Sequence, residues 1–164
     1  MIDPAYRSFV SYIDKSREFY GAHGYERPYQ WAYHADTPPF APLPGPLATL
    51  RLGVVTTTFP PLPSGQERPP KQAYAAPVDP PPTAMFTEDL SWDKDATHTD
   101  DPESFLPLAR LGEQVAAGRL GSLSPRFYGV PTEYSQRRTL TVDAPAILDL
   151  LREDGVDVAL LVPL

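Results

Sequence analysis

The residues best suited to proton transfer form a cluster of one histidine and two aspartates, His98, Asp100 and Asp101, in the segment ATHTDDPES. Histidine exchanges a proton near neutral pH, and a neighbouring carboxylate fixes its tautomer, which suits general acid–base catalysis. The His-x-Asp spacing also allows a metal site with a remote ligand such as His23 or His34. A structural role is the third interpretation, because aspartate before proline fits a turn or a helix N-cap. We take His98, Asp100 and Asp101 as the candidate catalytic residues and expect no metal.

A second group lies in residues 121–139, where several side chains can donate hydrogen bonds: Arg126, Tyr128, Tyr134, Arg137 and Arg138. A guanidinium binds a carboxylate through two parallel hydrogen bonds, so these arginines suit a small carboxylate ligand. The alternative is surface ion pairing with nearby acidic residues, Glu133, Asp143 or Asp149. We take Arg126, Tyr134 and Arg137 as candidate substrate-binding residues.

Two threonines complete the set of candidate substrate-binding residues. Residues 50–57, LRLGVVTT, are apolar and rich in β-branched side chains, which predicts a central strand buried on both faces. Thr56 and Thr57 stand at its carboxyl end, where ligands bind in open α/β sheets. As β-branched residues they also fit a strand that has no further role.

The elements that must position these residues are clearest in the second half of the chain. Apolar residues recur at helical spacing within residues 104–120, and we predict a helix that starts at Pro107 and ends at Gly118. A further helix is predicted to begin near Asp143 and to end at Gly155. Its predicted buried face consists of Ile147, Leu148 and Leu151.

Residues 158–162, VALLV, predict a second buried strand directly after this helix. A helix, a glycine turn and an apolar strand make half of a βαβ unit. We therefore predict an α/β layered fold with a parallel sheet. Because the chain stops at the carboxyl end of this strand, we expect the sheet to be incomplete at the C-terminus. Its exposed strand edge predicts pairing with a partner or with a second copy of the chain.

The first half of the chain is dominated by proline, which accounts for 22 of the 164 residues. Interior prolines break helices, so a long helical bundle and a coiled coil are excluded. We predict a helix over residues 1–21, an extended aromatic segment over residues 22–48 and a proline-rich loop over residues 59–84. A chain of this length holds one core, so we expect a single α/β domain over residues 1–164.

The charge balance and the hydropathy limit the classes of partner that the protein can bind. Lysine and arginine number 14 against 21 aspartates and glutamates, a net charge of −7, whereas a nucleic-acid binder needs a basic face. No stretch approaches the roughly 18 apolar residues of a membrane-spanning helix, and the first residues, MIDPAYRSFV, lack the basic segment and apolar segment of a signal peptide. We expect no nucleic acid, no membrane and a cytoplasmic location. The absence of cysteine excludes a thiol nucleophile within these residues.

Six segments together resemble the glycine/sarcosine/betaine/D-proline reductase family, selenoprotein B type. They are VTT at 55–57, the acidic stretch before SFLPL at 104–108, GRLGSLSPRFYGVPT at 118–132, YSQRRT at 134–139, DAPAIL at 143–148 and EDGVDVALLVP at 153–163. The similarity runs in order from about residue 50 to residue 164, roughly two thirds of the chain. The spacing of GSLSPRF, SQRRT and EDGVDVALLVP makes the resemblance specific, whereas each segment alone is weak.

The resemblance implies an oxidoreductase that cleaves a small amino-acid-like substrate reductively, with a disulfide as acceptor and a thiol/disulfide redox protein as partner. In that family a cysteine or selenocysteine follows the last strand, so the resemblance places this residue just beyond Leu164. Selenocysteine is encoded by UGA, and a gene prediction that reads UGA as a stop would end here. The alternative is a non-catalytic subunit or a small-ligand binding module of the same fold.

Overall fold

The computed structural model describes residues 18–25, 37, 41–61, 71–86, 98–130, 132 and 135–164. The chain divides into two compact units, Met1–Pro39 and Phe40–Leu164. In the first unit, residues 18–22 are helical, and the ring of Phe19 packs against Tyr20 and His23. Residues 1–17 of the helix expected over residues 1–21, and most of the aromatic segment, lie outside the described residues. The α/β fold belongs to the second unit.

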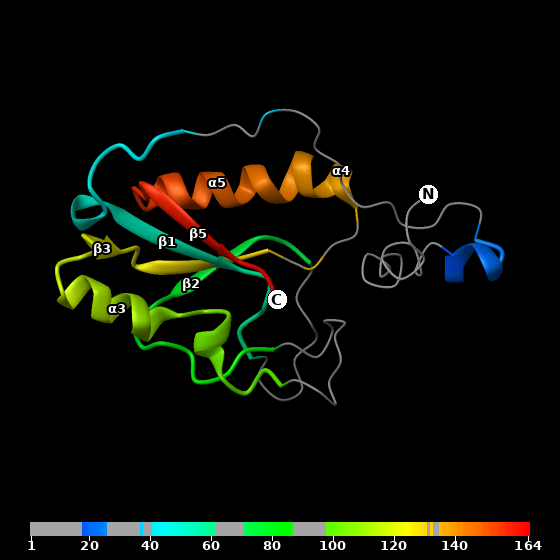
Figure 1. The fold of residues 1–164 in the computed structure, drawn as a ribbon, viewed down its shortest axis with the longest axis horizontal. Coiled ribbons are helices and arrows are strands. Elements are labelled where there is room, and N and C mark those ends of the chain that lie inside the picture. Colours follow the sequence, from blue (N-terminus) through cyan, green and yellow to red (C-terminus); the bar gives the residue numbers. More distant parts are fainter. Residues whose placement is uncertain are drawn as a thin grey trace, which may run out of the picture. The chain divides into compact units, whose positions relative to one another are not determined.

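Five strands form one mostly parallel, open sheet (Figure 1). The central strand β1, Arg51–Thr56, pairs in parallel with β5, Val158–Val162, from Leu52 to Thr56. Two short strands pair with the opposite side of β1, both in parallel. β3, Ser122–Leu123, pairs with the first two residues of β1, and β4, Arg126–Gly129, pairs with the last two. β2, Tyr74–Pro77, pairs antiparallel with β4. The predicted mixed α/β fold with a mainly parallel sheet is confirmed.

The helix predicted to start at Pro107 is α3, Leu108–Ala116. Gly118 follows it with a φ of 68°, a conformation in which glycine avoids the strain of a side chain. Two short 3₁₀ turns, η1 (Leu47–Thr49) and η2 (Pro102–Ser104), precede β1 and α3 respectively.

The last helix is α5, Ala144–Glu153, and Gly155 ends it with a φ of 62°. It begins earlier than the sequence predicts. α4, Gln136–Arg138, and η3, a π-helical turn over Thr139–Asp143, run directly into it. A π-helical turn inserts extra residues and is frequent at functional sites.

The two long helices cover opposite faces of the sheet, α5 above and α3 below in Figure 1. Val54 and Phe127 belong to the cluster that contains Leu108 of α3. Their neighbours Val55 and Tyr128 belong to the cluster that contains Ile147 and Leu151 of α5. Successive side chains of a strand point to opposite faces, so one central strand supports both cores.

Two burials predicted from the sequence are wrong, that of the strand β5 and that of Leu148 in α5. Among the described residues, β5 pairs only with β1, and Leu161 on it is 68 % exposed. A strand of apolar residues is buried only where other elements cover it on both sides. Leu148 is 44 % exposed, so Ile147 and Leu151 form the buried face of α5 without it.

The proline-rich loop expected over residues 59–84 is not a loop throughout, because β2 lies inside it. The residues of β2, YAAP, pair with β4 at the edge of the sheet. An edge strand tolerates proline, because the missing N–H of the proline can face the side that has no neighbouring strand. Residues 62–70 of this segment lie outside the described part of the chain. Within the described ranges, no helix combines the length and the apolar character needed to cross a membrane.

Candidate functional site

The carboxyl ends of β1, β4 and β5 meet at one edge of the sheet, where open α/β folds bind ligands (Figure 1). Thr57 follows β1 at this edge. Its hydroxyl accepts a hydrogen bond from the Leu164 backbone N–H at 2.9 Å and donates one to the Leu164 carbonyl oxygen at 3.2 Å. The segments after β1 and after β5 are thereby held side by side.

Thr56 is buried beneath this edge and its hydroxyl serves the fold. Thr56 Oγ1 lies 3.3 Å from Thr58 Oγ1, and both side chains are buried. The Tyr74 hydroxyl donates to the Thr58 carbonyl oxygen at 2.5 Å, and burial raises the pKa of this phenol. Phe59 stacks on the ring of Tyr74. Of the two predicted threonines, Thr57 is therefore the one whose hydroxyl lies at the strand ends.

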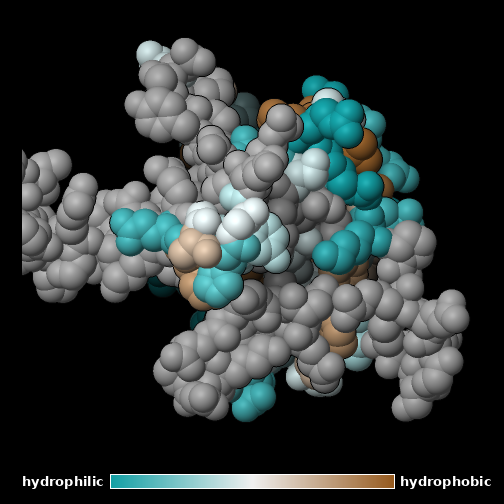
Figure 2. Space-filling model, turned by 90° about the vertical axis from the view of Figure 1, so that its right-hand side faces the viewer, coloured by the Kyte–Doolittle hydropathy of each residue, from teal (hydrophilic) through white to brown (hydrophobic). Residues whose placement is uncertain are grey.

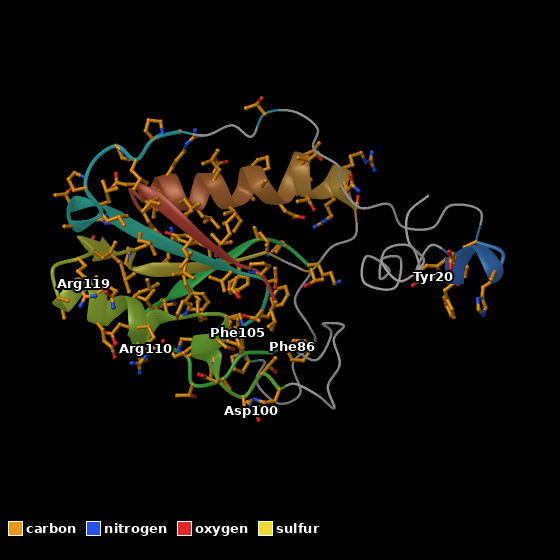
Figure 3. The ribbon with its side chains drawn as sticks, in the orientation of Figure 1. Tyr20, Phe86, Asp100, Phe105, Arg110 and Arg119 are labelled. Carbon is orange, nitrogen blue, oxygen red and sulfur yellow. The ribbon has the colours of Figure 1, made fainter. Side chains whose placement is uncertain are left out.

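The predicted His98 cluster forms in part. His98 Nδ1 lies 3.7 Å from Asp100 Oδ2, and the two side chains are 74 % and 90 % exposed. Asp101 does not join them, because its carboxylate accepts a hydrogen bond from the Glu103 N–H at 3.0 Å and caps η2. Asp100 lies at the outer rim of this loop, whereas Phe105 points into the core (Figure 3). Asp101 thus has the capping role that the sequence allowed.

Metal binding at His98 gains no support from the geometry. Within the described ranges, no three His, Asp or Glu side chains come together in a way that could hold a metal ion. His34, one of the proposed remote ligands, lies outside those ranges. His23 belongs to the first unit, where its Nδ1 lies 2.8 Å from the carbonyl oxygen of Phe19.

Arg126 lies at the amino end of β4, away from the edge that carries Thr57. Its guanidinium donates to both carboxylate oxygens of Asp154, at 2.8 and 2.9 Å, and to Glu153 at 2.9 Å. The Tyr128 hydroxyl donates to the same Asp154 carboxylate at 2.6 Å. The sequence allowed ion pairing as the alternative for this arginine, and the partners are residues at the end of α5.

The titration behaviour of this cluster follows from its hydrogen bonds. The bonds from Arg126 hold the pKa of the Asp154 carboxyl below its usual range, and the same contact raises the pKa of Arg126. Burial, assisted by the hydrogen bond to Asp154, raises the pKa of Tyr128 to about 12. The guanidinium makes three hydrogen bonds to residues at the end of α5, so this cluster stabilises the end of α5 against β4.

The remaining predicted arginine lies in α4, at the start of the long helix. Arg137 is exposed there, and Tyr134 lies outside the described residues. Arg138 donates to the Lys71 carbonyl oxygen, and its Nε lies 3.7 Å from Asp143 Oδ2. Arg137 and Arg138 are therefore near the carboxyl ends of the strands, whereas Arg126 is at the other end of the sheet.

A cavity of about 290 Å³ lies between the long helix and the strand ends, and sequence reasoning missed it. The described residues that line it are apolar apart from Thr139 and Asp143. Asp143 precedes a helix with proline in its first turn, a pattern typical of an N-cap. In the structure its backbone is helical and its carboxylate makes no capping hydrogen bond. Because the helix extends through η3, Asp143 lies within it and lines the cavity.

Comparisons with known protein families, with curated proteins and with solved structures found no match.

Proposed function

We propose that these residues form the substrate-holding part of a reductase similar to the glycine/sarcosine/betaine/D-proline reductases of selenoprotein B type. The proposal rests on the sequence segments that resemble this family and on where they lie in the fold. VTT ends β1, and EDGVDVALLVP spans the end of α5 and all of β5. Two motifs distant in the sequence thereby converge on one edge of the sheet.

The hydrogen-bonded pair of Thr57 and Leu164 is the observation that carries this proposal. It holds the backbone that follows β5 against the end of β1, at the edge where open α/β sheets bind ligands. A reactive group attached next to Leu164 would enter this edge. The family's chemistry needs a cysteine or selenocysteine in that place.

These 164 residues contain no cysteine, so a sulfur or selenium nucleophile has to come from another segment or another chain. Such a nucleophile attacks carbon as the amine leaves with the bonding electron pair. A first thiolate then attacks the sulfur or selenium of the adduct, and the carbon leaves with the bonding electron pair and takes up a proton. A second thiolate displaces the nucleophile from this mixed bond, so the two thiols supply the two electrons and become one disulfide. The substrate class is a small amine-bearing carboxylate, with exposed Arg137 as the candidate contact for the carboxylate. A thiol/disulfide protein completes the cycle, and the cytoplasm is the compartment that keeps thiols reduced.

A second candidate function is a non-catalytic module that binds a small ligand. The cavity lined by Asp143 favours this function, because residues of this chain line it. Binding there needs no nucleophile.

The experiment that separates the two is to read the gene beyond the Leu164 codon and to measure the intact mass of the protein from its native source. An in-frame UGA or cysteine codon, matched by a heavier protein, supports the reductase. Dithiothreitol-dependent release of amine from glycine, sarcosine, betaine or D-proline by that longer form, and by no 164-residue form, completes the test. Turnover by the 164-residue chain alone, or a UAA or UAG codon at position 165, contradicts it.

A further inference from the structure

The outer edge of β5 lacks the features that usually protect a sheet edge from pairing. Among the described residues, β5 pairs only with β1 (Figure 1), and its middle residues, 159–161, are exposed. Edge strands are commonly protected by charged side chains, by proline or by a bulge. Residues 158–162 include neither a charged residue nor a proline, and their register with β1 runs without a bulge. Within the described part of the chain, this edge is therefore open to a further strand.

Hydrogen bonds on the far side of β1 show which residues of β5 face outward. The carbonyl oxygens of Leu52 and Thr56 accept hydrogen bonds from the N–H groups of the residues that directly follow β3 and β4. Both oxygens therefore point away from β5. The backbone groups of successive strand residues point alternately to the two sides of the strand, so Gly53 and Val55 direct theirs to β5.

Ala159 and Leu161 direct their backbone N–H and C=O groups to the outer edge of the sheet. In the parallel register, Gly53 lies opposite Ala159 and Val55 lies opposite Leu161. In a parallel ladder, a residue that bonds to the neighbouring strand lies opposite a residue whose groups point away. The outer side of β5 thus offers two donors and two acceptors to a further strand.

We propose that this edge binds the same edge of a second copy of the chain, with the two β5 strands antiparallel about a two-fold axis at Leu160. Such an axis makes the same patch of both copies meet itself. Ala159 of each copy then lies opposite Leu161 of the other, and the two residues exchange both backbone hydrogen bonds. The outward groups of both residues are thereby paired in both copies. The two five-stranded sheets become one continuous sheet.

The two neighbouring registers leave backbone groups unpaired. If Leu161 lies opposite Leu161 of the second copy, Ala159 lies opposite Pro163, which has no N–H for the Ala159 carbonyl oxygen. If Ala159 lies opposite Ala159 of the second copy, Leu161 lies opposite Asp157. The Asp157 N–H already donates to a carbonyl oxygen of β1 at 3.0 Å. Of the three registers, the one centred on Leu160 pairs all four outward groups of β5.

The side chains fit the register centred on Leu160. Leu161 lies opposite Val55 and so points to the face covered by α5, where it is 68 % exposed. The register sets the small side chain of Ala159 beside it. On the other face, Leu160 is 36 % exposed and meets Leu160 of the second copy. Figure 2 looks onto the carboxyl ends of the strands and shows hydrophobic residues at the surface among hydrophilic ones. The dimer would cover apolar side chains that one copy exposes.

The charge distribution favours a second copy at this edge. The net charge of −7 opposes the approach of two copies, so their contact has to avoid charged residues. Residues 158–162 carry no charge. The antiparallel arrangement also places Asp157 of one copy and Asp157 of the other at opposite ends of the paired strands. The assignment concerns assembly and does not depend on the proposed reductase.

Single cysteine variants test the register, because these 164 residues contain no cysteine. In the proposed dimer the two Leu160 residues form a pair without backbone hydrogen bonds, with Cα atoms about 4.5 Å apart, a distance that a disulfide spans. Leu160→Cys is therefore expected to form disulfide-linked dimers under mild oxidation, detected by non-reducing electrophoresis. Ala116→Cys, at the exposed end of α3, is the control for random collisions and should cross-link far more slowly.

The flanking positions distinguish the register from its neighbours. Ala159→Cys alone and Leu161→Cys alone place their two cysteines on a diagonal, with Cα atoms about 7–8 Å apart, too far for a disulfide. Each is expected to cross-link no faster than the control, whereas a mixture of the two variants should form the mixed disulfide. Rapid cross-linking of either variant alone would overturn the register. Cross-linking of Leu160→Cys at the rate of the control would overturn the proposal.

Amide hydrogen exchange of the unmodified chain tests the same dimer without any variant. The amides of Ala159 and Leu161 face the second copy, so their protection should rise with protein concentration. The Leu160 amide faces β1 and should change less. Equally fast exchange of the first two amides at every concentration would overturn the proposal. Their protection in a monomer of 18.1 kDa would also overturn it, because another segment of the chain would then occupy the edge.

Discussion

The hydroxyl of Thr57 and the backbone of Leu164 exchange two hydrogen bonds across an edge of the sheet. The two residues are 107 positions apart in the chain, and the pairing of β1 with β5 brings them together. This contact extends the parallel ladder beyond the last strand pair, Thr56 and Val162. It therefore fixes the direction in which the backbone leaves the sheet.

Thr57→Val is expected to free the backbone after β5, because it removes both hydrogen bonds and keeps the β-branched shape. A typical hydrogen bond contributes about 0.5–1.5 kcal/mol to the free energy of unfolding, and an exposed one stands at the low end. The heteronuclear ¹⁵N NOE of Leu164 should fall to values typical of a mobile terminus. Thr57→Ser retains the hydroxyl and should keep the NOE; an unchanged NOE in Thr57→Val would contradict the role of this contact.

Asp154→Asn is expected to destabilise the fold near pH 7 by about 1.5–3 kcal/mol, the range for hydrogen bonds to a charged group. The Asp154 carboxylate is only 11 % exposed and binds Arg126 and Tyr128, so solvent screens it little. Urea unfolding of the variant, with exposed Asp149→Asn as the control, measures this difference. Equal stabilities of the two variants would contradict it.

The same carboxylate predicts how stability depends on pH. Because folding lowers the pKa of Asp154, its stabilisation is fully present above the ordinary aspartate value of about 3.9. It is lost as the pH falls from there through the lower pKa of the folded state. The stability difference between the unmodified chain and Asp154→Asn should therefore shrink on acidification. A difference that stays constant from pH 7 down to pH 2 would contradict this linkage.

Local signals in the sequence predicted the local elements correctly. Gly118 and Gly155 end helices with positive φ angles, and the β-branched run before Thr57 forms the central strand. His98 and Asp100 lie together because they are two residues apart. In each case the deciding interaction is made by near neighbours in the chain, so composition and spacing contain the information.

The remaining features depend on contacts between distant residues. The apolar run of β5 has the pattern of a buried strand, and only the absence of a described strand on its outer side makes Leu161 exposed. Arg126 finds Asp154 28 positions away, through the packing of α5 on β4. Asp143 has the pattern of a helix cap, but it lies inside the helix and lines the cavity because the helix starts earlier, at Gln136. No spacing rule contains these facts.

Gly129→Ala is expected to destabilise the protein by about 1–3 kcal/mol, the usual cost of overpacking. Gly129 pairs with Tyr74 across β4 and β2, and a Cβ at Gly129 would overlap the Tyr74 ring. That ring is held by its stacking on Phe59 and by the hydrogen bond to the Thr58 carbonyl oxygen, so it cannot move aside cheaply.

Gly112→Ala is the matched control for this substitution. Gly112 lies inside α3, and a Cβ there would meet nothing within 4 Å. Alanine favours a helix interior over glycine by about 0.8–1 kcal/mol, so this variant should be more stable than the unmodified chain. Thermal unfolding of both variants measures the contrast. A Gly129→Ala variant as stable as Gly112→Ala would show that Tyr74 does not pack as described.

The exposed edge of β5 predicts self-association. Its outer backbone groups pair with no described strand, and exposed Leu160 and Leu161 make the edge apolar, a combination that favours pairing with another strand. Size-exclusion chromatography with light scattering should therefore find species heavier than 18.1 kDa that increase with concentration. Leu161→Lys should shift the equilibrium towards the monomer, because a lysine on an edge strand opposes strand addition. Arg119→Lys, at an exposed position before β3, preserves the charge and should leave self-association unchanged. A monomer at every concentration would contradict self-association through β5.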